Sequence, residues 1–492
     1  MTVDGLPGGQ AAPISARLES AMRSRRLAAW LPPTRNLNAA IAADGELTIR
    51  RAREIVLGNA LATNAADEFV ANAVGTGIKP SPLQDDAAVK RSIQALWLAW
   101  TDEADADGLT DFYGLQALIA RELFVAGECF VRLRSRRLSD GLSVPLQLQL
   151  LQAEMLPLAK TGTAPNGNPI RCGIEFDAIG RRMAYWFLRK HPGDATDTSV
   201  AAEQYTRVPA DAVLHIRKPV EAGQLRGLPW ITPTLVRLFQ MDQYMDAQVE
   251  RQKTAALFVG FVTVASPDEA LLGETAMDDG TGLAQLRPAL FQKLLPGEDV
   301  TFSQPPGVGN DFDLFWYRVC LEVASGVGLP YAVLTGDLRQ ASYGSQRAGL
   351  IQFRRRMEQL QHSVFVFQFC RPVYQRWLAD AVLAGALALP GFAAAPRRWW
   401  PVKWIPPRWE WIDPLKDRQA EKLAVDAGFK ARADVVEAEG YDVEEVDARI
   451  KADHAREEAL GLNFASGAGE TQGARATPDR PAEPPQPDPQ AE

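Results

Sequence analysis

The side chains best able to do chemistry gather in a polar stretch at residues 335–347. They offer charges, hydroxyls and amides, but nothing in the stretch resembles a nucleophile beside a base or a set of metal ligands. The stretch is too polar for a core and too varied for a simple linker. Because helical patterns flank it and would fix it in space, we expect a functional contact here. The candidates are Arg339, Gln340, Ser342, Tyr343, Gly344, Ser345 and Arg347.

The signatures of common enzymes are missing from the chain. No Gly-Lys dipeptide occurs, so no nucleotide-binding P-loop can be built, and HExxH, GxSxG and a helix-opening GxGxxG are also absent. The four histidines are separated by 24 or more residues, and we interpret His215 and His362 as packed or solvated side chains. The four cysteines form no CxxC pair, which favours buried thiols in a reducing compartment over a metal site.

Three local features each allow two interpretations. Residues 75–77 (Gly-Thr-Gly) could cradle a phosphate, but a plain turn is favoured because no strand-to-helix context follows. The consecutive Arg354, Arg355 and Arg356 could touch nucleic acid or form a solvated helix face. The five tryptophans within residues 399–411 could stack bases, although the interleaved prolines favour a packing segment of strand and turn.

Composition bounds the class of protein. The chain has 492 residues, 46% of them hydrophobic and 23% charged, with a formal net charge of −8. That balance argues against wrapping nucleic acid by bulk electrostatics, which needs clustered Lys and Arg. No uncharged apolar run reaches the roughly 18–20 residues that span a bilayer, and the N-terminus lacks the apolar core of a secretory signal. We therefore expect a protein made in a cytoplasm.

The first half predicts an α+β domain over residues 25–220, with helices before strands. Apolar residues recur at helical spacing in residues 49–72, 87–104 and 111–126, the last capped by Asp111. Period-two or continuous apolar patterns then indicate strands at residues 129–134, 146–151, 173–176, 183–188 and 213–217.

The second half predicts long helices around a small insert. A helix opening at Thr232 and another at residues 311–327 enclose an insert of about 50 residues, which should project as a knob from a two-helix stalk. A long helix from Ser345 is expected to kink or break at Pro372. It carries a heptad seam that needs partner helices, formed by Leu350, Phe353, Met357, Leu360, Val364 and Phe367.

The two ends of the chain differ from its body. Residues 1–24, rich in glycine, proline and small side chains toward their start, are expected to be mobile. Residues 411–460 hold fourteen Asp and Glu against eight Lys and Arg in a helical pattern. Residues 466–492 contain six prolines and almost no large apolar side chains, so they should be disordered.

Several blocks resemble the portal proteins of tailed bacteriophages, in the lambda-type family. The resemblance runs from about residue 35 to 462, and the blocks occur in the family's order. They are VGTGIKP (74–80), AGECFVRL (126–133), LHIRKPVEAGQLRGLPWITPTL (214–235), GLPYAVLTGD (328–337), SYGSQRAGL (342–350), FCRPVYQRWL (369–378) and WIDPLKDRQA (411–420). One departure is SYGS at residues 342–345, where the family usually shows NYSS, and the added glycine should loosen that loop.

The resemblance implies a ring-forming α+β portal fold. It implies a homododecamer at one capsid vertex, through which double-stranded DNA is packaged and ejected, with no catalysis, cofactor, metal or membrane. The implied partners are the terminase large subunit, a major capsid or scaffold protein and a head–tail connector protein. The candidates of residues 335–347 would then contact the DNA backbone, and the heptad seam would face neighbouring subunits.

The implied parts follow the chain in order. They are a mobile N-terminus (1–24), wing (25–230), first stem helix (231–256), clip (257–309), second stem helix (310–328), tunnel loop (329–344), long helix with wing return (345–410), crown (411–465) and tail (466–492).

Two alternatives stay open. One is a nucleic-acid-processing enzyme with a carboxylate metal site, which DNA cleavage or joining with added Mg²⁺ would reveal. The other is a portal-like connector of a defective prophage or gene-transfer particle, or a connector that meets no DNA at all. Particles that assemble with this protein but lack DNA would indicate that last case.

Overall fold

The computed structural model describes residues 29, 34–194, 204–256, 260–264, 298–302, 311–339, 342–409 and 414–462. The chain divides into two compact units, Met1–Pro407 and Arg408–Glu492. The first unit combines helices with small sheets, which confirms the α+β class. The expectations for residues 1–24, for most of the insert at 257–309 and for the tail at 466–492 lie outside the described residues.

The first two helices meet at Asn59. Helix α1 covers Leu37–Gly58 and helix α2 covers Ala60–Ala73. The side-chain oxygen of Asn59 accepts the backbone N–H of Ala62 at 2.9 Å and so caps α2. The prediction of one helix over residues 49–72 is therefore wrong, because apolar periodicity runs on across a cap that changes only the backbone direction.

Helices α3 and α4 confirm the next two predictions. Helix α3 covers Ala87–Thr101, and its first turn is capped by the carboxylate of Asp86. Helix α4 covers Phe112–Val125, and Asp111 accepts the N–H of Gly114 at 2.6 Å, as the sequence predicted for this cap.

An aromatic cluster joins these helices to a segment far along the chain. Trp97 of α3 meets Trp377 edge-on at 5.0 Å and Phe112 of α4 at 5.1 Å. Phe112 in turn stacks on Phe369 at 5.3 Å. Rings of this size remove large apolar areas from water, so the cluster holds the two halves of the first unit together.

Two antiparallel sheets follow the helices. The three-stranded sheet has the order β3-β2-β9, formed by Leu146–Leu151, Glu128–Ser135 and Val213–Arg217. The five-stranded sheet has the order β4-β5-β6-β7-β8, formed by Gly162–Thr163, Pro169–Arg171, Ile174–Phe176, Arg182–Leu188 and Tyr205–Pro209. The strands predicted at residues 146–151 and 213–217 are confirmed, whereas β4, β5 and β8 went unpredicted because they are short and lack clear alternation.

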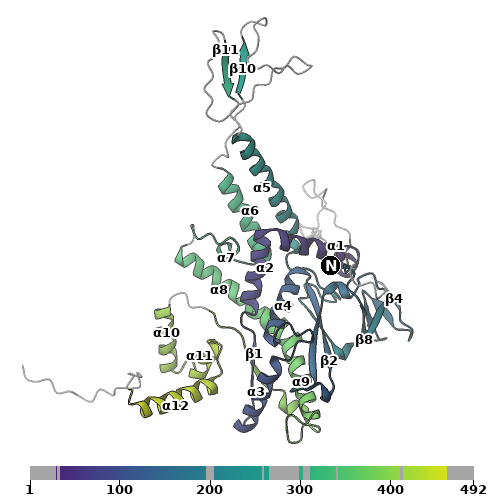
Figure 1. Cartoon of the computed structure of the whole chain (residues 1–492), viewed down its shortest axis with the longest axis vertical. Coiled ribbons are helices and arrows are strands. Elements are labelled where there is room, and N and C mark those ends of the chain that lie inside the picture. The colour runs from purple at the N-terminus through teal and green to yellow at the C-terminus, as the bar shows by residue number, and fades with distance from the viewer. Residues whose placement is uncertain are drawn as a thin grey trace, which may run out of the picture. The chain divides into compact units, whose positions relative to one another are not determined.

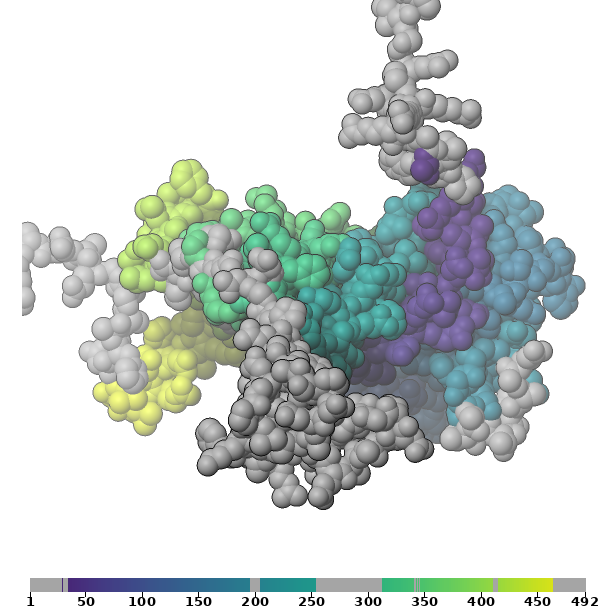
Figure 2. Space-filling view, turned by 90° about the horizontal axis from the view of Figure 1, so that it is seen from above, coloured from purple at the N-terminus to yellow at the C-terminus, as the bar shows by residue number. Residues whose placement is uncertain are grey.

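Hydrogen bonds from Arg53 hold helix α1 against helix α4 and the residues between the strands. The guanidinium of Arg53 donates to Glu122 of α4 at 2.8 and 3.0 Å and to Glu154 at 2.5 and 2.8 Å. In the space-filling view the purple surface of α1 lies alongside the blue surface of the sheet-bearing residues (Figure 2). One arginine thereby ties three parts of the first unit to one another.

A short two-stranded sheet brings the tryptophan-rich segment back to the N-terminal helices. Strand β1, Lys79–Pro82, pairs antiparallel with β12, Val402–Ile405. The packing interpretation of the tryptophan-rich segment is confirmed over its described residues, since Trp399 is only 7% exposed and Trp404 pairs opposite Pro80.

Two long helices run side by side (Figure 1). They are α5, Leu235–Ala256, and α6, Asp311–Val327, and the hairpin β10–β11 (Gly260–Val264 and Glu298–Phe302) belongs to the segment that joins them. Tyr244 of α5 meets the ring of Phe315 at 5.3 Å. The helices predicted on each side of the insert are therefore present.

A long helical run closes the first unit. It consists of α8 (Tyr343–Leu360), a π-helix labelled η7 (Gln361–Cys370) and α9 (Arg371–Leu383). Helical structure continues through Pro372, so the predicted break is wrong, and the backbone instead changes from α-helical to π-helical hydrogen bonding just before it. The N–H of Arg371 bonds Val366, five residues back, and Pro372 falls in the first turn of α9, where its missing N–H is tolerated.

The second unit is helical, as its sequence predicted. It contains α10 (Pro414–Asp426), α11 (Arg432–Ala438) and α12 (Val443–Leu460). Ion pairs join its segments, including Arg418 to Glu439 at 3.0 Å. Among its described residues none is a buried hydrophobic.

Candidate functional site

The candidate loop begins where a short helix ends at a glycine. Helix α7, Tyr331–Thr335, follows Pro330, whose fixed backbone suits a helix start. Gly336 then takes a φ of 70°, a left-handed conformation that glycine adopts without a steric penalty. Helix α7 therefore ends at this turn, and Leu338 and Arg339 after it are exposed.

Asp337 organises the loop through a pair of bonds to one arginine. Its carboxylate accepts from Nε of Arg339 at 3.0 Å and from Nη2 at 2.9 Å, and it also accepts the Arg339 backbone N–H at 3.0 Å. The Tyr331 hydroxyl donates a further bond at 3.3 Å. The bonds from Arg339 lower the pKa of Asp337 to about 2, so the carboxylate stays ionised. The side chain of Arg339 is nevertheless 82% exposed.

The base of the loop is anchored to the body of the first unit. The side-chain amide of Asn64, on α2, donates to the carbonyls of Val333 and Leu334 at 2.9 and 2.8 Å. These are carbonyls at the end of α7, which have no partner within so short a helix. Tyr331 also packs edge-on against Tyr317 of α6 at 4.8 Å.

The predicted candidates sit in three settings. Arg339 is on the exposed loop, and Gln340 lies outside the described residues. Ser342 is exposed, and its carbonyl accepts the N–H of Gln346 in the first turn of α8. The other candidates are in α8 itself, where Gly344 is exposed and Arg347 is half-buried; the remaining two are Tyr343 and Ser345.

The heptad seam faces the chain itself. Four of its six residues are at most 4% exposed in the single chain, namely Phe353, Met357, Leu360 and Val364. On the same side of the helical run, Gln361 donates to the carbonyl of Ala73 at the end of α2, at 3.0 Å. The prediction that these four face a neighbouring subunit is therefore wrong, because a heptad pattern looks the same whichever chain covers it. Phe367, which is 61% exposed, and the half-buried Leu350 can still meet a partner.

A buried ionic cluster beside strand β2 was not predicted. Glu128 of β2 accepts from Nε of Arg226 at 2.6 Å and from the backbone N–H of Gly227 at 2.6 Å, and it bonds Nε2 of His215 at 2.7 Å. Arg226 also donates to the carbonyl of Cys172 at 2.8 Å. The three charged or titratable residues fall within two of the family-like blocks, but spacing alone could not show that they meet.

Burial sets the protonation state of this cluster. Burial lowers the pKa of His215 to about 3 against the pull of the Glu128 carboxylate, so the ring is neutral near pH 7. Burial alone would raise the pKa of Glu128, but Arg226, His215 and the Gly227 N–H outweigh it and lower that pKa to about 2. The cluster is thus a satisfied structural junction, which agrees with the interpretation of His215 as a packed histidine.

Metal-ligating clusters are missing from the part of the chain that the structure describes. It contains no group of three or more His, Cys, Asp or Glu that could hold a metal ion. The four cysteines are buried and unpaired, as expected. No described helix is both long and apolar enough to cross a membrane.

The described residues thus combine an α+β body with two long helices side by side and an exposed, anchored loop. The sequence profile of the phage portal proteins of the lambda family matches residues 23–361. This chain belongs to that family, which confirms the resemblance seen in the sequence blocks.

Individual relatives agree with this assignment. A probable portal protein of Halomonas phage phiHAP-1 is 27% identical over 438 residues, covering 85% of this chain and 82% of that protein. Portal protein B of Escherichia phage lambda is 21% identical and the portal protein of Escherichia phage N15 is 22% identical, each covering 89% of both chains. Among solved structures, a chain in the neck of a native gene transfer agent particle is 14% identical, with a TM-score of 0.44 over 81% of this chain and 92% of that one.

Proposed function

We propose that twelve copies of this chain form a ring at one vertex of a capsid and that double-stranded DNA passes through the ring during packaging and ejection. Family membership supports the function, and the surface of the paired helices supports the ring. Large apolar side chains of α5 and α6 are at least half exposed in the single chain: Val236, Phe239, Leu314 and Phe315. Such a surface is costly in water unless another copy covers it.

Each part of the chain then has a role in the proposed ring. We assign residues 25–230 to the wing, 231–256 and 310–328 to the stem, 257–309 to the clip, 329–344 to the tunnel loop, 345–410 to the long helix and wing return, and 411–465 to the crown. The clip would meet the terminase that supplies the force. Other surfaces would meet the major capsid or scaffold protein and the head–tail connector protein.

The loop after α7 carries the mechanistic part of the proposal. It is anchored at its base by Asn64, yet its arginine reaches into solvent. Asp337 holds that arginine in a two-bond ion pair, which weakens its attraction for phosphate. A loop of this kind would touch the DNA backbone without reading sequence and without gripping it. Translocation needs such a contact, because tight binding of phosphates would stall the moving duplex.

Removing residues 340–344 tests this role. We expect the deletion to reduce DNA packaging or retention in particles by more than tenfold, while negative-stain microscopy still shows rings with the normal number of subunits. Deletion of residues 470–474, five residues of the C-terminal segment, is the matched control and should leave packaging unchanged. Normal packaging by the loop deletion would overturn the proposed role of the loop.

The relationship to a gene transfer agent chain leaves the type of particle as a second question. The same ring could serve a phage, a prophage remnant or a gene-transfer particle. Sequencing the DNA inside particles that contain this protein separates these cases, because a phage packages mainly its own genome and a gene-transfer particle packages mainly host fragments.

A further inference from the structure

The three arginines at residues 354–356, which could touch nucleic acid or form a solvated helix face, have different surroundings in the structure. Arg354 is half-buried, whereas Arg355 and Arg356 are exposed. The guanidinium of Arg356 lies against Gly328, the residue that follows α6. Gly328 has a φ of 79°, and a Cβ added there would be 3.2 Å from Nη1 of Arg356. A glycine thus stands where a side chain would crowd this guanidinium.

A lysine from a distant segment comes to the same end of α6. Lys218 directly follows β9, and its ammonium lies 3.9 Å from the ring centre of Trp230. The indole N–H of Trp230 donates to the carbonyl of Val327, the last residue of α6, at 2.7 Å, and the Trp230 ring meets that of Phe69 at 4.9 Å. The tryptophan therefore holds the exposed lysine near the place where Arg356 lies.

These two cations repel one another, and the described residues do not neutralise them. Burial and the charge of Arg356 both lower the pKa of Lys218. Within the part of the chain that the structure describes, neither Lys218 nor Arg356 forms an ion pair with a carboxylate, whereas Arg339 is paired with Asp337. Because like charges without a counter-charge are unfavourable together, an anion that binds to both side chains removes their repulsion.

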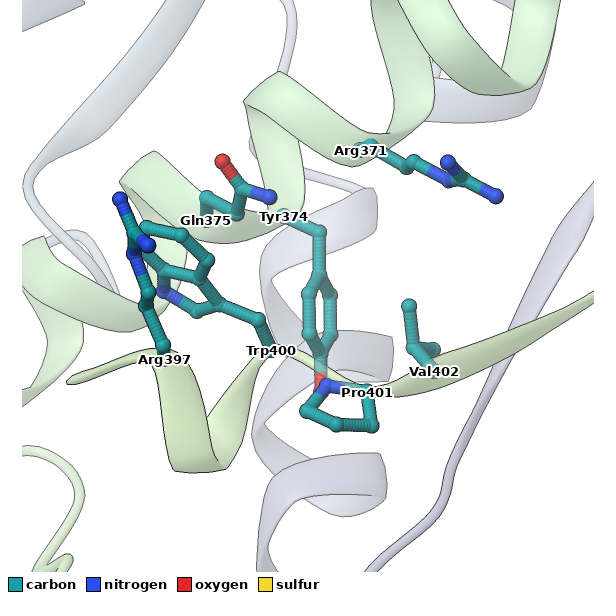
Figure 3. Close-up of a pocket in the computed structure, with 7 residues that line it drawn as sticks. All are labelled: Arg371, Tyr374, Gln375, Arg397, Trp400, Pro401 and Val402. Carbon is teal, nitrogen blue, oxygen red and sulfur yellow. The ribbon is translucent and has the colours of Figure 1, made fainter. Parts of the chain in front are cut away.

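A second pair of arginines has a different arrangement. Arg371, at the start of α9, lines a pocket of about 300 Å³ with Arg397 on the opposite side, and the two guanidinium groups point apart (Figure 3). The guanidinium of Arg397 instead lies 5.7 Å from the ring centre of Trp400. Arg371 is therefore a single exposed charge on the same helical run as Arg356, which makes it a suitable control.

The site of Lys218 and Arg356 is close to the candidate loop. Arg356 is thirteen residues after Tyr343, where α8 begins at the end of that loop. At about 1.5 Å per residue this separation is about 20 Å along the helix, which is roughly six base pairs of a duplex. A duplex carries phosphates along its whole length, so one molecule of DNA can supply an anion to both places. The spacing therefore favours DNA over an acidic protein segment as the ligand.

We propose that Lys218 and Arg356 form a binding site for a phosphate group of the DNA backbone. The arginine offers a planar fork of donors to the phosphate, the lysine adds a compact charge, and neither reads sequence. The inference rests on the proposed passage of DNA through the ring, and it adds a phosphate contact outside the loop. Because both cations are exposed, salt screens the contact, and a duplex driven by a motor can leave it.

Chemical modification of Lys218 in the full-length protein tests the site. Lysines are acetylated at low salt with and without a short DNA duplex of mixed sequence, and the acetylated fraction of each lysine is read by mass spectrometry. We expect the duplex to lower acetylation of Lys218 about fivefold and to leave Lys79, an exposed lysine of β1, unchanged. Arg356→Gln should reduce this protection to less than about twofold, whereas Arg371→Gln should preserve it.

The same variant separates binding from folding. Because Arg356 repels Lys218, Arg356→Gln should leave the free energy of unfolding unchanged or raise it. A lower free energy of unfolding would show that Arg356 holds the fold, and it would overturn the proposal.

Three results of the modification experiment would also overturn it. They are no protection of Lys218 by the duplex, protection that survives Arg356→Gln, and equal protection by poly-glutamate at the same concentration of charge. The last result would identify an acidic protein segment as the ligand. The DNA content of natural particles is measured separately. Particles filled with DNA, together with an unprotected Lys218, would remove this site and leave the proposed conduit standing.

Discussion

At the scale of single residues, the loop after α7 contains an exposed arginine that is already paired with a carboxylate. Nε and Nη2 of Arg339 donate to the Asp337 carboxylate at 3.0 and 2.9 Å, although the Arg339 side chain is largely exposed to solvent. A phosphate that approaches must compete with a carboxylate already in place. The ion pair therefore weakens the attraction of Arg339 for a phosphate, although the net charge of the loop is unchanged.

Neutralising Asp337 should make the loop adhere to DNA. We predict that Asp337→Asn frees Arg339, strengthens DNA retention and slows packaging several-fold at low salt, since salt screens exposed charges. The free energy of unfolding should hardly change, because solvent screens this ion pair. The double variant Asp337→Asn, Arg339→Gln restores the local charge and should package normally. Equal packaging by the single and double variants would contradict this account.

The cluster around Glu128 makes the free energy of unfolding depend on pH. His215 has a pKa of about 3 in the folded chain against about 6.5 unfolded, so between these values the unfolded state binds the extra proton. Glu128, with a lowered pKa of about 2, adds a further loss below about pH 4.3. The contribution of these two residues to the free energy of unfolding is therefore complete above about pH 6.5, and it falls as the pH is lowered below that value.

Chemical denaturation at fixed protein concentration checks this prediction. The free energy of unfolding should fall from pH 7 to pH 4, and His215→Gln should flatten the part between pH 6.5 and 4.5. His362→Gln, at an exposed position, is the control and should keep the natural slope. A profile without slope in the natural protein would contradict the burial of a neutral histidine.

At the scale of elements, one side chain decides where the loop sits. The side-chain amide of Asn64 on α2 donates to the carbonyls of Val333 and Leu334, and Gly336 ends the helix just after them. Helix α7 has only five residues, so these two carbonyls lie in its last turn, where a helix provides no N–H groups for them. Helix α2, more than two hundred residues earlier in the chain, thus helps to fix the position of the loop.

Removing that amide should loosen the loop without unfolding the unit. We predict that Asn64→Ala costs about 1–2 kcal/mol and speeds hydrogen exchange of residues 333–339. Asn72→Ala is the control, because its amide bonds only Glu68 in its own helix. Unchanged exchange in the Asn64 variant would show that another contact positions the loop.

At the scale of the whole molecule, the apolar side chains that can meet another copy of the chain lie mainly on the paired helices. The seam of α8 is covered within the chain, whereas α5 and α6 leave Phe239 and Leu314 56% and 59% exposed. The surface that can hold neighbouring copies together is therefore on the paired helices. Phe369 of the π-helix and Trp377 of α9 are fully buried and pack in the aromatic core of the first unit.

Assembly and folding should accordingly respond to different substitutions. We predict that Phe239→Ser with Leu314→Ser weakens or abolishes ring formation in analytical ultracentrifugation, while circular dichroism still shows a folded chain. Met357→Ala, at 1% exposure, should instead cost about 2–5 kcal/mol of unfolding free energy. Intact rings from the double serine variant would show that the ring is held by other surfaces.

The sequence alone determined the local elements and the family. The strands at residues 146–151 and 213–217, the cap at Asp111 and the helices around the insert follow from periodicity and capping chemistry, which act over a few residues. The portal family was visible because several blocks keep their residues and their order.

Only the tertiary structure decided which surfaces meet. It placed Glu128 beside Arg226 and His215, set Arg53 between two carboxylates and covered the heptad seam with the chain's own residues. Periodicity predicts that one side of a helix is buried, but it does not predict which residues cover that side. That choice depends on contacts between residues far apart in the chain, whose geometry exists only after folding.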